Sequence, residues 1–240
     1  MSSRGDNKNE VDSEQPMSGS TVELATAHIL RNLEEHRKGP STKTTPLFVA
    51  IQGPQGSGKT FLTSQLCDIL RSPPHSLSVA TLSIDDLYLP HADLVALAKR
   101  HGENVLLQGR GQPGTHDVQL ARTLLRDLLH INDSGSPGGR NSTRVLLPVY
   151  DKSLHNGAGD RTQNVVAVDP LVDVVILEGW CVGFFPLPSE EIEKRWAEQF
   201  RGNTSTIQRY RKEDILELNE LLKEYVALWD FFTVFIQVRR

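Results

Sequence analysis

Four residues at fixed spacing could hold a phosphate group. Gly53, Gly58, Lys59 and Thr60 fit GxxxxGK[ST], in which glycines let backbone N–H groups turn inward around phosphate. In this pattern the lysine bridges the β- and γ-phosphates of a nucleotide, and the threonine hydroxyl binds Mg²⁺. A glycine-rich turn with a solvated lysine is the alternative interpretation. The spacing predicts a nucleotide-binding loop made of Gly53, Pro54, Gln55, Gly56, Ser57, Gly58, Lys59 and Thr60.

Acidic residues follow two apolar runs that resemble strands. Asp85 and Asp86 follow one run, and Glu178 is near the end of another. Because the carboxyl ends of parallel strands meet at one edge of a sheet, these acids should lie beside the phosphate loop. Glu178 is predicted to bind Mg²⁺ with Thr60, and Asp85 to accept the proton of an acceptor hydroxyl. The alternative for Glu178 is a carboxylate that caps the next element. The alternative for Asp85 and Asp86 is a solvated turn, and of the two aspartates Asp86 is the one expected to have only a structural role.

Strand-like runs and helical apolar patterns alternate along the chain. Strands are predicted at 47–52, 77–84, 171–179 and 231–238, and a β-hairpin at 145–151 and 163–169. Helices are predicted at 21–37, from about 59 onward, near 94–98, at 118–128 and at 215–229. We expect Thr115 to cap the helix at 118–128. This order predicts a doubly wound, mainly parallel α/β sheet.

Composition and charge exclude several classes of function. The chain of 240 residues is 38% hydrophobic, enough for one domain at 21–240 behind a disordered tail at 1–20. A net charge of −4 argues against nucleic acid as the main partner, and no apolar run could span a membrane. The first residues do not resemble a signal or transit peptide, and only two cysteines occur, Cys67 and Cys181. We therefore expect a cytoplasmic protein, with the nucleus as a further location.

Four stretches behind the phosphate loop resemble one kinase family. SIDDLYL, RGQPGTHD, PVYDKSLHNGAGDR and ILEGWCVGF occur in the order seen in ATP-dependent kinases related to plant and fungal D-glycerate 3-kinase. They are more distantly similar to uridine kinase, phosphoribulokinase and bacterial pantothenate kinase. The resemblance runs from about residue 20 to the last residue. It implies a P-loop kinase fold that uses ATP and Mg²⁺ to phosphorylate a hydroxyl of a small metabolite, with D-glycerate as first choice.

The resemblance also implies roles for individual residues. Asp85 matches the general base, and several residues fall where relatives contact or cover the acceptor. Arg110 is a separate candidate, because a small carboxylate needs a cationic partner. As an alternative, His116 is a histidine at a helix start that bonds the backbone. For Lys152 and Arg161 the alternative is a pair of solvated charges on the hairpin. The predicted acceptor-binding residues are Tyr88, Arg110, His116, Asp117, Tyr150, Asp151, Lys152 and Arg161.

The end of the chain departs from this family. The sequence stops at QVRR, whereas the family continues through a lid helix that carries arginine and a final strand. We therefore expect a fold without the lid and last strand, in which 231–238 is an exposed edge strand. This departure keeps open a non-catalytic nucleotide-binding protein, and a uridine-kinase-like nucleoside kinase is a further alternative. The guanine-reading NKxD of GTPases does not occur. The acceptor and the oligomeric state stay open.

Overall fold

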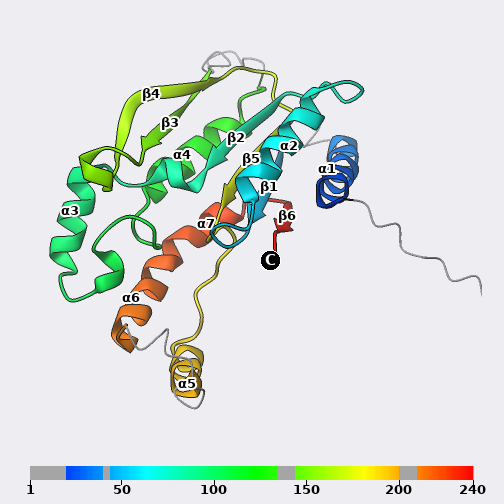
Figure 1. The fold of residues 1–240 in the computed structure, drawn as a ribbon. Coiled ribbons are helices and arrows are strands. Elements are labelled where there is room, and N and C mark those ends of the chain that lie inside the picture. Colours follow the sequence, from blue (N-terminus) through cyan, green and yellow to red (C-terminus); the bar gives the residue numbers. More distant parts are fainter. Residues whose placement is uncertain (1–19, 40–43, 134–143, 200–209, 240) are drawn as a thin grey trace, which may run out of the picture.

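The centre of the molecule is a sheet of four parallel strands in the order β2-β5-β1-β6 (Figure 1). Its strands are β1 (Leu47–Gln52), β2 (Val79–Ser83), β5 (Val174–Gly179) and β6 (Val234–Gln237). The computed structural model describes residues 20–39, 44–133, 144–199 and 210–239, so the tail predicted at 1–20 lies almost entirely outside the described residues. The predicted α/β fold with a mainly parallel sheet is confirmed.

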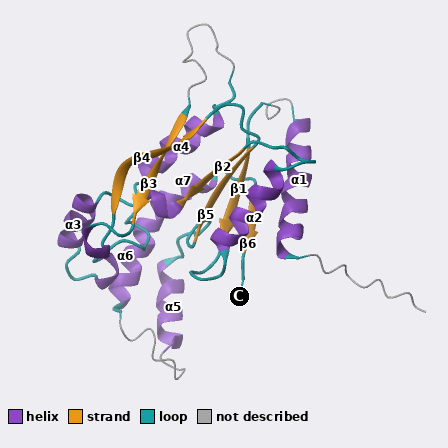
Figure 2. Cartoon of the chain, turned by 45° about the horizontal axis from the view of Figure 1, so that its top comes forward, coloured by secondary structure: helices purple, strands orange, loops and turns teal. Residues whose placement is uncertain are grey.

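Helices cover both faces of this sheet. One face carries α1 (Thr21–Lys38) and α2 (Lys59–Arg71), and the other carries α4 (Val118–Leu129) and α7 (Val226–Trp229) (Figures 1 and 2). Residues therefore alternate between two apolar cores along each central strand. This arrangement leaves the carboxyl ends of the strands open beside the start of α2.

Burial on both faces explains why the sequence of β5 is a continuous apolar run. Val174 and Ile176 of β5 pack toward α1 and α2, whereas Val175 and Leu177 pack toward α4 and α7. All four side chains are at most 1% exposed. A strand buried on both faces has no position for a polar side chain until its last residues, where Glu178 precedes Gly179.

A separate two-stranded hairpin lies beside the sheet, next to its β2 edge. β3 (Val145–Asp151) and β4 (Asp160–Val168) are antiparallel, as predicted, and pack over α4 and the 3₁₀ turn at Ile84–Leu87. The end of the hairpin approaches α3 (His91–Arg100), as Figures 1 and 2 show. The hairpin thus forms one wall above the carboxyl end of β2.

Three local predictions differ from the structure. The helix expected at 215–229 is divided into α6 (Lys212–Leu222), a 3₁₀ turn and α7, and α5 (Ser189–Gln199) was not predicted. The cap of α4 is Asp117, whose carboxylate accepts from the N–H of Leu120, rather than Thr115. The Thr115 hydroxyl instead bonds within its own turn, to the backbone of Gly111 and Gln112.

Among the described residues, no helix combines the length and apolar character needed to cross a bilayer.

Candidate active site

The predicted phosphate loop connects β1 to α2 in a tight turn. Gly56 and Gly58 have φ angles of 70° and 85°, a region that favours glycine. A side chain on Gly53 would lie 2.8 Å from both the Ser57 hydroxyl and the Val238 carbonyl oxygen. No side chain caps the start of α2, so its first N–H groups are available to an anion. The loop therefore has the shape that the sequence pattern requires.

Oxygen atoms from three elements meet beside this loop. The Glu178 carboxylate accepts hydrogen bonds from the Thr60 hydroxyl at 3.4 Å and from the Ser83 hydroxyl at 3.1 Å. Ser83 and Glu178 are direct partners in the β2–β5 register, which fixes this contact. The Lys59 ammonium donates to the Pro54 carbonyl 3.2 Å away. These groups line a small cavity of about 60 Å³, together with Gln55, Asp85, Gly179 and Trp180.

This arrangement fits a magnesium ion carried with a nucleotide. Hydroxyl and carboxylate oxygens are the ligands that Mg²⁺ prefers, and the ion commonly uses one or two carboxylates plus substrate phosphates. The described residues contain no cluster of three or more His, Cys, Asp or Glu side chains that could hold a metal alone. Thr60 and Glu178 therefore suit an ion that arrives with phosphate, and their metal-binding role stays a prediction.

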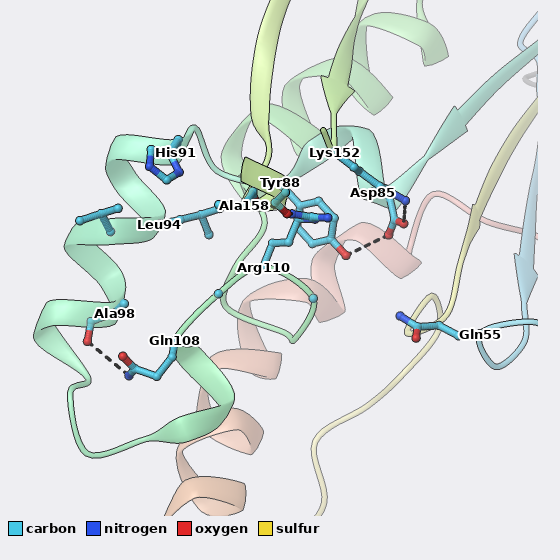
Figure 3. A pocket seen from close by; sticks show the side chains of 14 residues that line it. Gln55, Asp85, Tyr88, His91, Leu94, Ala98, Gln108, Arg110, Lys152 and Ala158 are labelled. Atoms are coloured by element: carbon cyan, nitrogen blue, oxygen red, sulfur yellow. Dashed lines mark hydrogen bonds and ion pairs between the residues drawn. The ribbon is translucent and has the colours of Figure 1, made fainter. Parts of the chain in front are cut away.

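Asp85 lies just after β2, at the start of the 3₁₀ turn. One carboxylate oxygen, Oδ1, accepts from the Tyr88 hydroxyl at 3.0 Å, and the other, Oδ2, accepts from the Lys152 ammonium at 2.6 Å (Figure 3). The neighbouring acid Asp86 accepts from the backbone N–H of Tyr150, and burial raises the pKa of Asp86. Asp86 thus anchors the hairpin, whereas Asp85 faces the open site.

A larger cavity of about 620 Å³ lies next to the phosphate loop. Asp85 and Gln55 line both this cavity and the small one beside Lys59, so the two spaces meet at these residues. Figure 3 shows Asp85 and Gln55 on one side of the cavity and α3 on the other. A hydroxyl bound in the large cavity could approach a phosphoryl group held by the loop, with Asp85 between them.

Three of the predicted acceptor-binding residues line the large cavity, namely Tyr88, Arg110 and Lys152. The Arg110 guanidinium is already engaged, because its Nη1 donates to the carbonyl oxygens of Gly157, at 2.6 Å, and Ala158. It therefore fixes the turn of the hairpin at the cavity wall. A direct contact between Arg110 and an acceptor carboxylate stays a prediction.

The other five predicted residues are absent from the cavity lining and make contacts within the protein. His116 is 5% exposed, stacks on Tyr88 and hydrogen-bonds the Tyr225 hydroxyl through Nδ1. Burial lowers the pKa of His116 to about 4. Arg161 donates to the Tyr88 carbonyl oxygen at 2.9 Å and to Asp117 at 3.2 Å. His116 therefore packs against the ring of Tyr88, and Arg161 binds its backbone.

Tyr150 and Asp151 also have local partners. The Tyr150 ring packs edge-on against Tyr88 with centroids 5.3 Å apart, and burial raises the pKa of its hydroxyl. The Asp151 carboxylate accepts from the hydroxyl and N–H of Ser153, which lowers its pKa. The structure thus places both residues at the hairpin end, next to the site, and their contact with an acceptor stays a prediction.

One face of α3 forms a cavity wall that the sequence analysis did not identify. His91, Leu94, Val95 and Ala98 line the cavity and occupy positions i, i+3, i+4 and i+7 of one helix. Gln108 faces them and donates to the Ala98 carbonyl (Figure 3). The helical spacing was visible in the sequence, but nothing in it showed that this face borders a site rather than the core.

Several known proteins that are similar to this chain are kinases. No family model matches the chain. A solved structure of D-glycerate 3-kinase from Cryptococcus neoformans is 40% identical, with a TM-score of 0.83, and the match covers 91% of this chain and 73% of that chain. A Saccharomyces cerevisiae protein described as a probable ATP-dependent kinase is 41% identical over 143 residues, which are 59% of this chain and 48% of that protein.

A third relative is the chloroplastic D-glycerate 3-kinase of Arabidopsis thaliana. It is 35% identical over 150 residues, covering 62% of this chain and 31% of that protein. The chain thus spans half or less of the length of these two curated relatives. The match to the solved structure nevertheless extends over most of both chains. This chain belongs to the family of P-loop kinases that includes the D-glycerate 3-kinase of Cryptococcus neoformans.

Proposed function

We propose that this chain binds ATP with Mg²⁺ and transfers the γ-phosphoryl group to a hydroxyl of a small metabolite, with D-glycerate as the first candidate. The observation that carries the proposal is the position of Asp85, which lines both the cavity beside the phosphate loop and the larger cavity. A general base must reach the acceptor hydroxyl close to the phosphoryl group. Asp85 has the position that this reaction requires.

The nucleotide is proposed to lie along the loop at 53–60. Backbone N–H groups and the start of α2 would receive the β-phosphate, and Lys59 would leave the Pro54 carbonyl for the phosphates. Thr60 and Glu178 would hold Mg²⁺. When bound, the ion would neutralise charge on the phosphate oxygens and orient them. Asp85 would orient the acceptor hydroxyl and take its proton.

Two observations support an anionic acceptor such as D-glycerate. The cavity is lined by two basic side chains, Arg110 and Lys152, against one acid, Asp85. The Cryptococcus neoformans relative with this fold is a D-glycerate 3-kinase. A nucleoside is the second candidate, because about 620 Å³ exceeds what a three-carbon acid fills and because Leu94, Val95 and Ala98 give one apolar wall.

The test is ADP production by this chain with Mg-ATP against D-glycerate, uridine, pantothenate and ribulose 5-phosphate. We expect D-glycerate to give the highest kcat/KM and the Asp85→Asn variant to lose this activity while it still binds ATP. A preference for uridine would support the nucleoside kinase instead. If calorimetry shows ATP binding but no acceptor stimulates ADP release, the chain is a non-catalytic nucleotide-binding protein and the proposal is wrong.

A further inference from the structure

Both carboxylate oxygens of Asp85 already have hydrogen-bond donors. The Tyr88 hydroxyl is 3.0 Å from Oδ1, and the Lys152 ammonium is 2.6 Å from Oδ2. A general base needs a lone pair that faces the hydroxyl whose proton it accepts. An acceptor hydroxyl therefore competes with one of these two donors for the side of the carboxylate that faces the cavity.

The two donors differ in how firmly they are held. Tyr88 is 3% exposed, stacks on His116 and meets Tyr150 edge-on, so its hydroxyl cannot move without disturbing a packed cluster. The Lys152 side chain is 55% exposed and reaches Asp85 from the end of the hairpin. A long, exposed lysine side chain changes rotamer at little cost. Lys152 is the donor that an acceptor hydroxyl can replace.

The position of Lys152 also suits a role at the phosphoryl group. Among the described residues that line the two cavities, the lysine and arginine side chains are Lys59, Arg110 and Lys152. Lys59 belongs to the phosphate loop, and the Arg110 guanidinium holds two hairpin carbonyls. Asp85 borders both cavities, so the ammonium bound to it lies where the acceptor and phosphate spaces meet.

We propose that Lys152 is a catalytic residue that changes partner during the reaction, an inference that rests on the proposed function. Before the acceptor binds, the Lys152 ammonium occupies Oδ2 of Asp85. The acceptor hydroxyl then takes this place, and Lys152 moves to the oxygens of the γ-phosphoryl group of a nucleoside triphosphate. Here it stabilises the charge of the transition state.

The chemical step balances with these groups. The acceptor oxygen forms a bond to the γ-phosphorus, and the bond from this phosphorus to the β,γ-bridging oxygen breaks. The electron pair of the broken bond stays on the nucleoside diphosphate, and the acceptor proton passes to Asp85. Lys152 contributes positive charge and gives up no proton.

The first test separates kcat from KM in Lys152→Met. We expect kcat to fall roughly 10² to 10³-fold, as for other lost donors to transition-state charge, with the KM for the acceptor unchanged or lower. The matched control is Lys223→Met, because Lys223 forms an exposed ion pair of the same length, 2.6 Å, with Glu220. A raised acceptor KM at unchanged kcat would show that Lys152 only binds the acceptor, and would overturn the proposal.

The second test restores the ammonium chemically. In Lys152→Cys, treatment with 2-bromoethylamine creates a lysine analogue, whereas iodoacetamide adds a neutral group. Cys67 and Cys181 are buried, and burial raises the pKa of both thiols, that of Cys181 to about 12, so neither should react readily. We expect kcat to recover with bromoethylamine alone. Equal activity after both treatments would show that the charge is not required.

A third test needs no acceptor. The affinity of MgADP with aluminium fluoride, which mimics the planar phosphoryl group, is measured by calorimetry in wild type and Lys152→Met. We expect the variant to bind this complex at least tenfold more weakly, with equal affinity for MgADP alone. If wild type phosphorylates no acceptor, the proposed function fails, but this difference still supports Lys152 at the phosphoryl position. Equal affinities in the two proteins would overturn the role of Lys152 alone.

Discussion

The ring of His116 stacks on the ring of Tyr88, with centroids 4.5 Å apart and planes inclined by 19°. An antiparallel β-bridge also joins the backbones of the two residues. The Tyr88 hydroxyl donates to Asp85, so the stack on His116 fixes the side from which the Asp85 carboxylate receives this hydrogen bond. The orientation of the proposed base thus depends on a buried histidine that makes no direct contact with the cavity.

The first prediction concerns the protonation of His116. Burial lowers the pKa of His116 from 6.5 to about 4, so the folded protein keeps this ring neutral where the unfolded chain protonates it. The unfolded state then binds more protons between these two values, and stability falls as the pH drops from about 6.5 to about 4. The contribution reaches at most about 1.4 kcal/mol per pH unit.

The measurement is the free energy of unfolding in denaturant at several pH values for wild type and His116→Phe. The phenyl ring keeps the stack on Tyr88 but cannot be protonated, so the variant should lack this part of the pH dependence. All other ionisable groups are the same in the two proteins, so the difference between the two curves isolates His116. Parallel pH curves for the two proteins would contradict a neutral buried His116.

The second prediction concerns Lys59. Its removal in Lys59→Ala takes away the cation proposed to meet the β- and γ-phosphates, a contact worth roughly 10 to 150-fold in nucleotide affinity. The measurement is calorimetry with Mg-ATP, and Lys38→Ala is the control, because Lys38 pairs with Glu35 on the surface of α1. Unchanged affinity in Lys59→Ala would leave this lysine without a role at the phosphates.

The parallel sheet was predictable because its strands are short apolar runs, and β5 is marked twice in the sequence. The run at 174–177 is apolar throughout, since both faces are buried, and an acid ends it at Glu178. The phosphate loop is equally visible, because the glycines at 56 and 58 have positive φ angles that other residues avoid. Local chemistry decides both features, so sequence spacing is enough to locate them.

The acceptor side was harder to predict because it depends on contacts between distant segments. Arg161 and His116 looked available to a ligand, yet Arg161 reaches the Tyr88 carbonyl 73 positions away, and His116 reaches Tyr225 at a separation of 109. The partner of Lys152 is likewise 67 positions away, at Asp85. No local sequence pattern indicates which of these polar side chains already has a hydrogen-bond partner within the protein.

The third prediction follows from the partners of Arg161. Its guanidinium is about 20% exposed and bonds both the Tyr88 carbonyl and Asp117, so Arg161→Leu leaves two acceptors without their donor. We expect the free energy of unfolding to fall by about 1 to 3 kcal/mol. Arg144→Leu is the control from the same hairpin, because Arg144 and Asp169 form an exposed pair whose loss should cost about 1 kcal/mol or less. Equal stability of the two variants would show that Arg161 is not structural.

The fourth prediction concerns Arg110. Arg110→Leu removes the donor to the Gly157 and Ala158 carbonyls and a cation from the cavity wall. We expect the KM for an anionic acceptor to rise roughly tenfold or more while the KM for ATP stays nearly unchanged, because the lost groups face the acceptor. Steady-state kinetics with each substrate varied in turn provides the measurement. An equal rise in both KM values would place Arg110 at the triphosphate instead.

The last prediction concerns the two neighbouring acids after β2. Asp85→Asn keeps the shape of the side chain but removes the proton acceptor, so kcat should fall roughly 10² to 10⁴-fold while ATP affinity is retained. Asp86→Asn is the matched control, because its amide oxygen can still accept from the Tyr150 N–H, and its kcat should stay within a few-fold of wild type. Rapid-quench kinetics would measure the chemical step in each variant. If Asp86→Asn is the slower enzyme, the base is Asp86, and the orientation of Asp85 toward both cavities does not reflect its chemistry.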